Sequence, residues 1–198
     1  MIGFRIPMVA GIAFAVGNLI LPAAQAAEPD GPTALITRMD AVYINIIDRL
    51  NAEGKKALSL DEKDKKSLAA YYMDHSQKLL WVTDTGLNDR AAQLQTTFDR
   101  AAEWGLNPSD YVLADNKDTA EQSAYSAPRL AELELKTSVA AYTYAKHAQT
   151  GRFDPESLTE YWDKHPERPQ ATDVLNGIAN AGNDIPSFLE SFHPPHEQ

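Results

Sequence analysis

Apolar residues after position 33 recur at intervals of three or four, and this spacing constrains the fold more than any other feature of the chain. One series begins at Leu130 and continues through Leu133, Thr137, Ala140 and Tyr144. That interval matches the 3.6-residue turn of an α-helix, whereas a half-buried strand would alternate at every second residue. Because no stretch of useful length alternates in that way, the sequence predicts an all-α protein.

Start and stop signals divide this pattern into helices. Asn88 and Ser126 are suited to the N-cap position, and Gly105 and Gly151 are suited to end the helices that follow them. An earlier helix is expected to begin at Ser59, because Glu62 three residues later completes a capping box. We therefore expect helices over residues 33–51, 59–78, 88–105 and 126–151.

The segments between these helices have the composition of turns and loops. Residues 83–87 are expected to form a turn, and residues 106–111 a tight corner in which Pro108 opens a short helical turn. Residues 115–124 are polar and are expected to form a surface loop. Beyond residue 151, closely spaced prolines and glycines leave room only for short helices such as 172–181 and 187–192. The predicted fold is an irregular helical bundle with several short helices in its C-terminal third.

The N-terminus has the three parts of a secretory signal peptide. Arg5 precedes a largely apolar stretch over residues 6–21, and Ala24 and Ala26 provide the small side chains that signal peptidase requires. We expect a signal peptide over residues 1–26, cleavage after Ala26 and a periplasmic mature protein. The alternative is an uncleaved anchor, which would be the chain's only contact with a membrane.

Composition excludes several functions. Acidic residues outnumber basic ones by 28 to 18, and a net charge of −10 is unsuited to binding nucleic acid. The chain has no cysteine, which excludes a thiol nucleophile, cysteine-based metal sites and disulfides. No motif for an activated serine, a zinc helix or a phosphate loop is present, so no cofactor and no metal are expected. A pair of catalytic carboxylates has no fixed spacing, so a muramidase mechanism stays open.

Histidines and aromatic residues are the remaining candidates for a site. His193 and His196 are too few to bind a metal and are expected to be exposed, whereas His75 and His147 are expected to be hydrogen-bonded residues at helix boundaries. The aromatic residues near turns are expected to fill corners between helices. The neighbours Tyr161 and Trp162 are the candidates for stacking on a glycan.

An ordered set of motifs resembles a known family. Residues 68–81 read LAAYYMDHSQKLLW, residues 105–111 read GLNPSDY, Tyr144-Ala145 precede Gly151-Arg152, and residues 194–198 read PPHEQ. In this order they resemble the scaffold domain of the large periplasmic L,D-transpeptidases, which cross-link peptidoglycan stem peptides. The resemblance covers about residues 58–198, preceded by an N-terminal helix and linker over residues 27–57.

The resemblance implies a helical scaffold that is followed, in the family, by a peptidoglycan-binding module and a catalytic domain with a cysteine nucleophile. None of that catalytic pattern is present, so no catalytic residue can be assigned and the chain alone is not expected to be an enzyme. The resemblance assigns structural roles to six residues, namely Tyr72, Trp81, Gly105, Leu106, Pro108 and Tyr111.

These observations lead to two hypotheses. The first is a non-catalytic scaffold or accessory protein that acts in cell-wall remodelling by docking to a cell-wall enzyme, or to a catalytic domain encoded separately or beyond a disrupted frame. An apolar docking surface would then be exposed as a large patch. The alternative is a peptidoglycan-binding or muropeptide-binding module that uses Tyr161 and Trp162.

Overall fold

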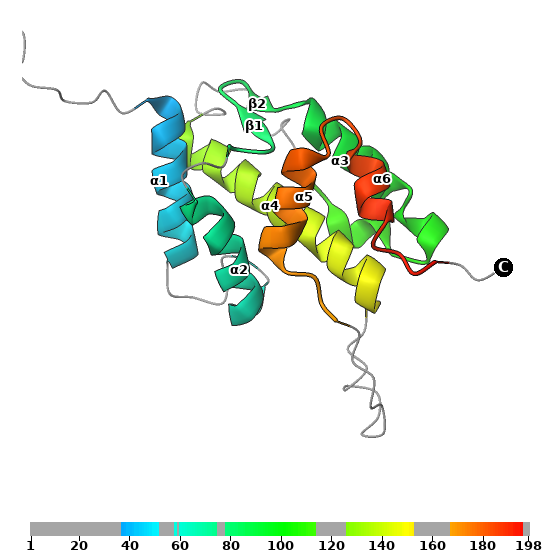
Figure 1. The fold of residues 1–198 in the computed structure, drawn as a ribbon. Helices are drawn as coiled ribbons and strands as arrows, with labels where there is room; N and C mark the ends of the chain where they lie inside the picture. Colours follow the sequence, from blue (N-terminus) through cyan, green and yellow to red (C-terminus); the bar gives the residue numbers. More distant parts are fainter. Residues whose placement is uncertain are drawn as a thin grey trace, which may run out of the picture. The chain divides into compact units, whose positions relative to one another are not determined.

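One long helix organises the computed structural model of the protein, α4 (Ala127–Thr150), which is contacted by most other elements (Figure 1). The structure describes residues 37–51, 58, 60–74, 78–113, 126–152 and 167–195. All of them belong to one compact unit, Leu35–Gln198. Among these residues the all-α class is confirmed, since six α-helices are accompanied by two 3₁₀ helices and one hairpin of two-residue strands.

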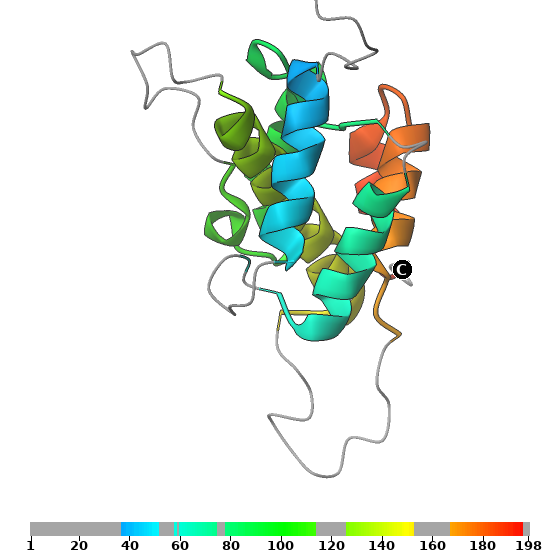
Figure 2. The same ribbon diagram turned by 90° about the vertical axis from the view of Figure 1, so that its left-hand side faces the viewer.

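The remaining helices surround α4 in two groups. α1 (Arg38–Asn51) packs against α4 and lies in front of it in Figure 2, and α2 (Glu62–Met73) packs against α1 and α5 (Ala171–Asn180). α3 (Asp89–Asp99) packs against α6 (Ile185–Glu190), and α5 also contacts α4 and α6. No helix among the described residues is long and apolar enough to cross a bilayer.

Local signals explain the boundaries of α4 and α3. Ser126 stands in extended conformation before α4, Pro128 lies in its first turn, and Gly151 ends it with a positive φ of 82°. The Asn88 side chain accepts hydrogen bonds from the backbone N–H groups of Arg90 and Ala91, at 3.0 and 3.3 Å. These boundaries agree with those expected. The Asn88 side chain caps α3, whereas the Ser126 side chain makes no capping hydrogen bond, and α4 is bounded by Pro128 in its first turn and by Gly151.

Other boundaries differ from those expected. α1 begins after Thr37, whose hydroxyl and backbone N–H exchange hydrogen bonds with Asp40, so the helix does not extend back through this residue. α2 is capped by Asp61, which accepts from the Asp64 N–H at 2.8 Å, rather than by Ser59, and it ends at Met73. In the span expected to be one helix up to Gly105, α3 ends at Asp99 and is followed by the 3₁₀ helix η1 (Ala101–Trp104).

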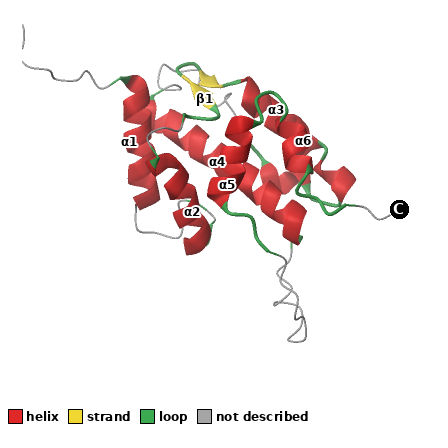
Figure 3. Cartoon of the chain, viewed as in Figure 1, coloured by secondary structure: helices red, strands yellow, loops and turns green. Residues whose placement is uncertain are grey.

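The expected turn at residues 83–87 carries two short strands (Figure 3). In β1 (Val82–Thr83) and β2 (Gly86–Leu87), Val82 pairs with Leu87 and Thr83 with Gly86. The turn itself is therefore confirmed, but the expectation that the chain contains no strand is wrong at this point. Strands of two residues are too short to produce a detectable alternation in the sequence.

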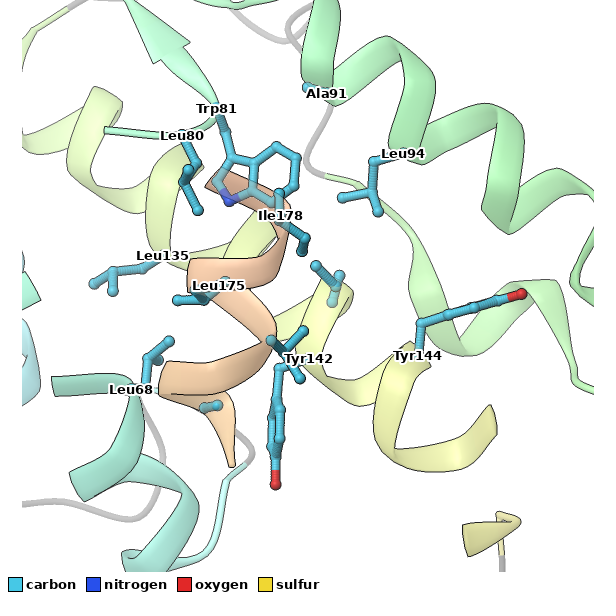
Figure 4. Packing of buried hydrophobic residues seen from close by; sticks show 14 of the residues in the cluster. Leu68, Leu80, Trp81, Ala91, Leu94, Leu135, Tyr142, Tyr144, Leu175 and Ile178 are labelled. Atoms are coloured by element: carbon cyan, nitrogen blue, oxygen red, sulfur yellow. The ribbon is translucent and has the colours of Figure 1, made fainter. Parts of the chain in front are cut away.

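The core forms where the helix groups meet. Figure 4 shows buried side chains of this cluster, with Ile178 and Leu94 on the side of Trp81 and with Leu68 and Leu135 farther from it. Each of these side chains is almost completely removed from solvent. Gly177 of α5 allows a close approach, because a Cβ atom there would collide with the ring of Phe188 in α6. This contact fixes the short helices of the C-terminal third against each other.

Candidate functional site

A cleft of about 560 Å³ opens at the C-terminal end of α4. Three segments form its walls: the end of η1 with Gly105 and Leu106, the last turn of α4 with Gly151 and Arg152, and the pair His193 and Pro194. Its volume falls in the range of small-molecule binding sites. The cleft is therefore a candidate ligand site in the described part of the molecule.

The corner at residues 105–111 builds one wall of the cleft. Gly105 adopts a left-handed conformation with φ of 74°, and its N–H donates to the Ala102 carbonyl at 3.1 Å. Leu106 is buried, and Pro108 lies in the first turn of the second 3₁₀ helix, η2 (Pro108–Tyr111). This sequence of turns delivers the Tyr111 side chain, which is fully buried, beneath α4.

An ion pair joins this corner to the end of α4. Arg152 Nε lies 2.7 Å from Asp110 Oδ2. Gly151, directly before Arg152, has a positive φ that favours glycine, so the chain can turn away from the helix axis here. The two sequence segments 105–111 and 151–152 are thus brought together at one side of the cleft.

Two buried tyrosines each hold a histidine of the cleft. The Tyr111 hydroxyl lies 2.9 Å from His147 Nδ1, and the Tyr144 hydroxyl lies 3.1 Å from His193 Nε2. The rings of Tyr111 and Tyr144 meet edge to face at 5.3 Å. Burial raises the pKa of Tyr144 to about 12 and also raises the pKa of Tyr111, so both hydroxyls keep their protons at neutral pH.

The contact with Tyr111 determines the tautomer of His147. Among the described residues the buried Tyr111 hydroxyl has His147 as its one hydrogen-bond partner and satisfies its proton only by donating it, so Tyr111 donates to His147 Nδ1. Burial lowers the pKa of His147, which favours the neutral ring. Its proton therefore resides on Nε2, and His147 is one of the residues that line the cleft.

His193 differs from the sequence prediction. It was expected to be exposed, yet it is partly buried, and its ring stacks on Trp104 with centroids 4.2 Å apart and an interplanar angle of 12°. The stacking partner and Tyr144 are both remote in sequence, so the local Pro-Pro context gave no sign of them. His147, in contrast, is the hydrogen-bonded residue near the end of a helix that was expected.

A second polar cluster lies buried between α2, α4 and the segment before β1. The Glu134 carboxylate accepts from the backbone N–H groups of Leu80 and Trp81, at 2.8 and 2.9 Å, and from the Tyr72 hydroxyl at 3.0 Å. Ser138, one turn later in α4, accepts from Trp81 Nε1 at 2.8 Å and lies 2.6 Å from the Tyr72 hydroxyl. The structure places Tyr72 and Trp81 in this cluster, away from the cleft walls.

Glu134 is the residue of this cluster that sequence reasoning missed. It is completely buried, and burial raises its pKa to about 7 despite the hydrogen bonds it accepts. The signal was present, because Glu134 follows Leu130 by four residues and lies between Leu133 and Leu135 on the apolar side of its helix. A carboxylate at such a position must find donors in the core.

Several candidates fall elsewhere. Tyr161, Trp162, His75 and His196 lie outside the described residues. Within the described ranges, no group of three or more histidines, aspartates or glutamates is arranged to hold a metal ion.

The large apolar patch expected for a docking surface is not found on the part of the chain that the structure describes. There the exposed large hydrophobic residues are Ile44 in α1, Met73 at the end of α2 and Val112 after η2. The other large apolar side chains in these ranges are buried or partly buried in the core. The expectation fails because the helices cover one another's apolar faces.

Comparison with known proteins assigns the chain to a family. No curated protein and no solved structure matches it. The family model described as Scaffold domain matches residues 66–198, a span that contains the cleft and the Glu134 cluster. Because this match covers more than half of the 198 residues, the chain belongs to the Scaffold domain family.

Proposed function

We propose that this protein is a non-catalytic helical scaffold of the peptidoglycan L,D-transpeptidase type, exported to the periplasm, where it supports a catalytic cell-wall partner. The observation that carries the proposal is the Scaffold domain match over residues 66–198. The motifs at residues 105–111 and 151–152, on which the resemblance to these transpeptidases rests, lie within that span. The Asp110–Arg152 ion pair joins these two motifs in the folded protein.

The absence of cysteine suggests how the catalytic and scaffold roles are divided in this proposal. A transpeptidase of this type forms a thioester on a cysteine, and this chain contains no cysteine. In this proposal the catalytic partner supplies the thiolate, and the residues described here contribute a helical surface. The exposed apolar residues of the described part are few and stand on different elements, so the contact is expected to be mainly polar.

Deletion of the coding region tests the role in the cell wall. Sacculi from the deletion strain should contain fewer cross-links of the L,D type, measured by chromatography of muropeptides, and the full-length gene in trans should restore them. An unchanged cross-link profile would contradict the proposal. Export is tested separately by mass spectrometry of the protein from the periplasmic fraction. The measured mass should equal that of a chain whose first residue is Ala27.

Direct peptidoglycan binding is the alternative, and a pull-down on purified sacculi distinguishes it. Retention that is lost on Trp162→Ala would favour a binding module that uses Tyr161 and Trp162. Absence of retention, together with fewer L,D cross-links in the deletion strain, would favour the scaffold role. Release of soluble fragments from the sacculi would instead indicate a muramidase.

A further inference from the structure

We propose that the cleft at the end of α4 binds the carboxylate end of a short peptide. The chain carries a net charge of −10, yet no acidic residue is among the described residues that line the cleft. Its ionisable lining residues are His147, His193 and Arg152. This inference uses the cleft alone and does not rest on the proposed role in the cell wall.

His147 supplies a donor that the fold has oriented. Its Nδ1 accepts from the Tyr111 hydroxyl, so its Nε2 carries the proton and makes no hydrogen bond to any residue in the described ranges. Because the buried tyrosine already fixes the imidazole, ligand binding costs less entropy for ordering this ring. Carboxylate oxygens are the acceptors that such an N–H and a nearby guanidinium bind most strongly.

Arg152 supplies the positive charge at the same cleft. Asp110 holds the guanidinium through Nε at 2.7 Å and partly offsets its charge. The pair places a cation in the lining of the cleft that His147 also lines, without burying it, since the Arg152 side chain is 36% exposed. A carboxylate that approaches the cleft thus meets a donor and a cation that the free protein already holds in position.

The end of α4 supplies acceptors for the rest of the ligand. The last carbonyl groups of a helix lack intrahelical donors, and Gln149 and Thr150 of this turn line the cleft. These carbonyls repel a bare anion but accept from an amide N–H, which a peptide carries beside its terminal carboxylate. The stacked rings of Trp104 and His193 provide an apolar wall for the peptide backbone. The combination favours an N-acylated amino acid over an inorganic anion.

The probe for this site is N-acetylglycylglycine, titrated into the isotope-labelled protein and followed by NMR at the His147 ring and by calorimetry. We expect saturable binding that shifts the resonances of the cleft residues. The neutral amide N-acetylglycylglycinamide should bind about tenfold more weakly or worse, since it loses a charge-assisted hydrogen bond. No saturable shift, or equal affinities for acid and amide, would overturn the proposal.

Variants locate the site. His147→Phe and Arg152→Gln should each weaken N-acetylglycylglycine about tenfold, because each removes one partner of the carboxylate. Lys136→Gln is the matched control, since it removes one positive charge from a 52% exposed side chain of the same helix outside the cleft, and it should leave affinity unchanged. If His147→Phe fails to fold, the surface variant Arg152→Gln is the test of the site. Undiminished binding by Arg152→Gln, or an equal loss in Lys136→Gln, would refute the assignment.

Discussion

The buried Glu134 should make the protein less stable as the pH rises from about 4.5 to 7. Burial raises the pKa of this carboxyl from 4.5 to about 7 in the folded protein. Between these two values the folded state binds more protons than the unfolded state, so the free energy of unfolding falls with increasing pH. A separation of about 2.5 pH units corresponds to about 3 kcal/mol, which is fully present below pH 4.5 and lost above pH 7.

The competing effect is the set of hydrogen bonds to the carboxylate. Two backbone N–H groups and the Tyr72 hydroxyl donate to Glu134, and donors of this kind favour the ionised form. Complete burial removes the carboxylate from water and opposes ionisation. The direction of the pH dependence therefore measures which effect dominates, because the two predict opposite slopes.

Urea unfolding at pH 5 and pH 7.5, compared between wild type and Glu134→Gln, isolates this group. The variant should show a smaller loss of stability with rising pH than the wild type, and the other ionisable groups cancel in the comparison. Glu134→Gln should also lower the free energy of unfolding by about 1–3 kcal/mol at pH 5. The glutamine amide has only one oxygen, so one of the two backbone N–H groups, of Leu80 or of Trp81, then faces an NH₂ group that cannot accept its hydrogen bond. If the wild type gains stability relative to the variant between pH 5 and 7.5, the carboxylate is ionised in the fold and the reasoning is refuted.

Three further substitutions test the packing by thermal and urea unfolding. Thr137→Val should stabilise the protein by about 1 kcal/mol, because the buried Thr137 hydroxyl has no hydrogen-bond partner among the described residues; a loss of stability would contradict this. Gly177→Ala should destabilise it by about 1–3 kcal/mol through collision with Phe188, and Phe188→Leu should recover part of that loss; no recovery would contradict the contact. Asp64→Asn should lower the free energy of unfolding by about 2–4 kcal/mol, because buried Asp64 accepts from Lys146 Nζ at 2.7 Å. The same substitution should cost less in a protein that already carries Lys146→Met, and an equal cost would contradict the pairing.

The sequence predicted those parts of the fold that neighbouring residues determine. The start of α3 could be predicted from Asn88, because its side chain satisfies backbone groups within one turn of itself. The bounds of α4 could be predicted from Ser126, Pro128 and Gly151, whose backbone conformations suit the two ends of a helix although the Ser126 side chain makes no capping hydrogen bond. The start of α2 was placed wrongly because two capping residues compete within three positions. Asp61 is the cap, and it also binds Arg168 at 3.3 Å, a partner remote in sequence.

The candidate site was harder to predict for the same reason. His147 could be anticipated as a hydrogen-bonded residue from its place near the end of α4, but the tyrosine that orients it comes from the corner at η2. The position of His193 depends on Trp104 and Tyr144, which belong to two other elements. Sequence periodicity reports which face of a helix is buried and contains no information on which remote side chain will meet it.

The motif residues at the η1–η2 corner have a physical explanation that involves no catalysis. Gly105 takes the left-handed conformation that ends η1, Leu106 anchors the turn in the core, and Pro108 starts η2. Together they place the Tyr111 hydroxyl within 2.9 Å of His147. These residues therefore have a structural role, because they form one wall of the cleft and position the side chain that contacts His147.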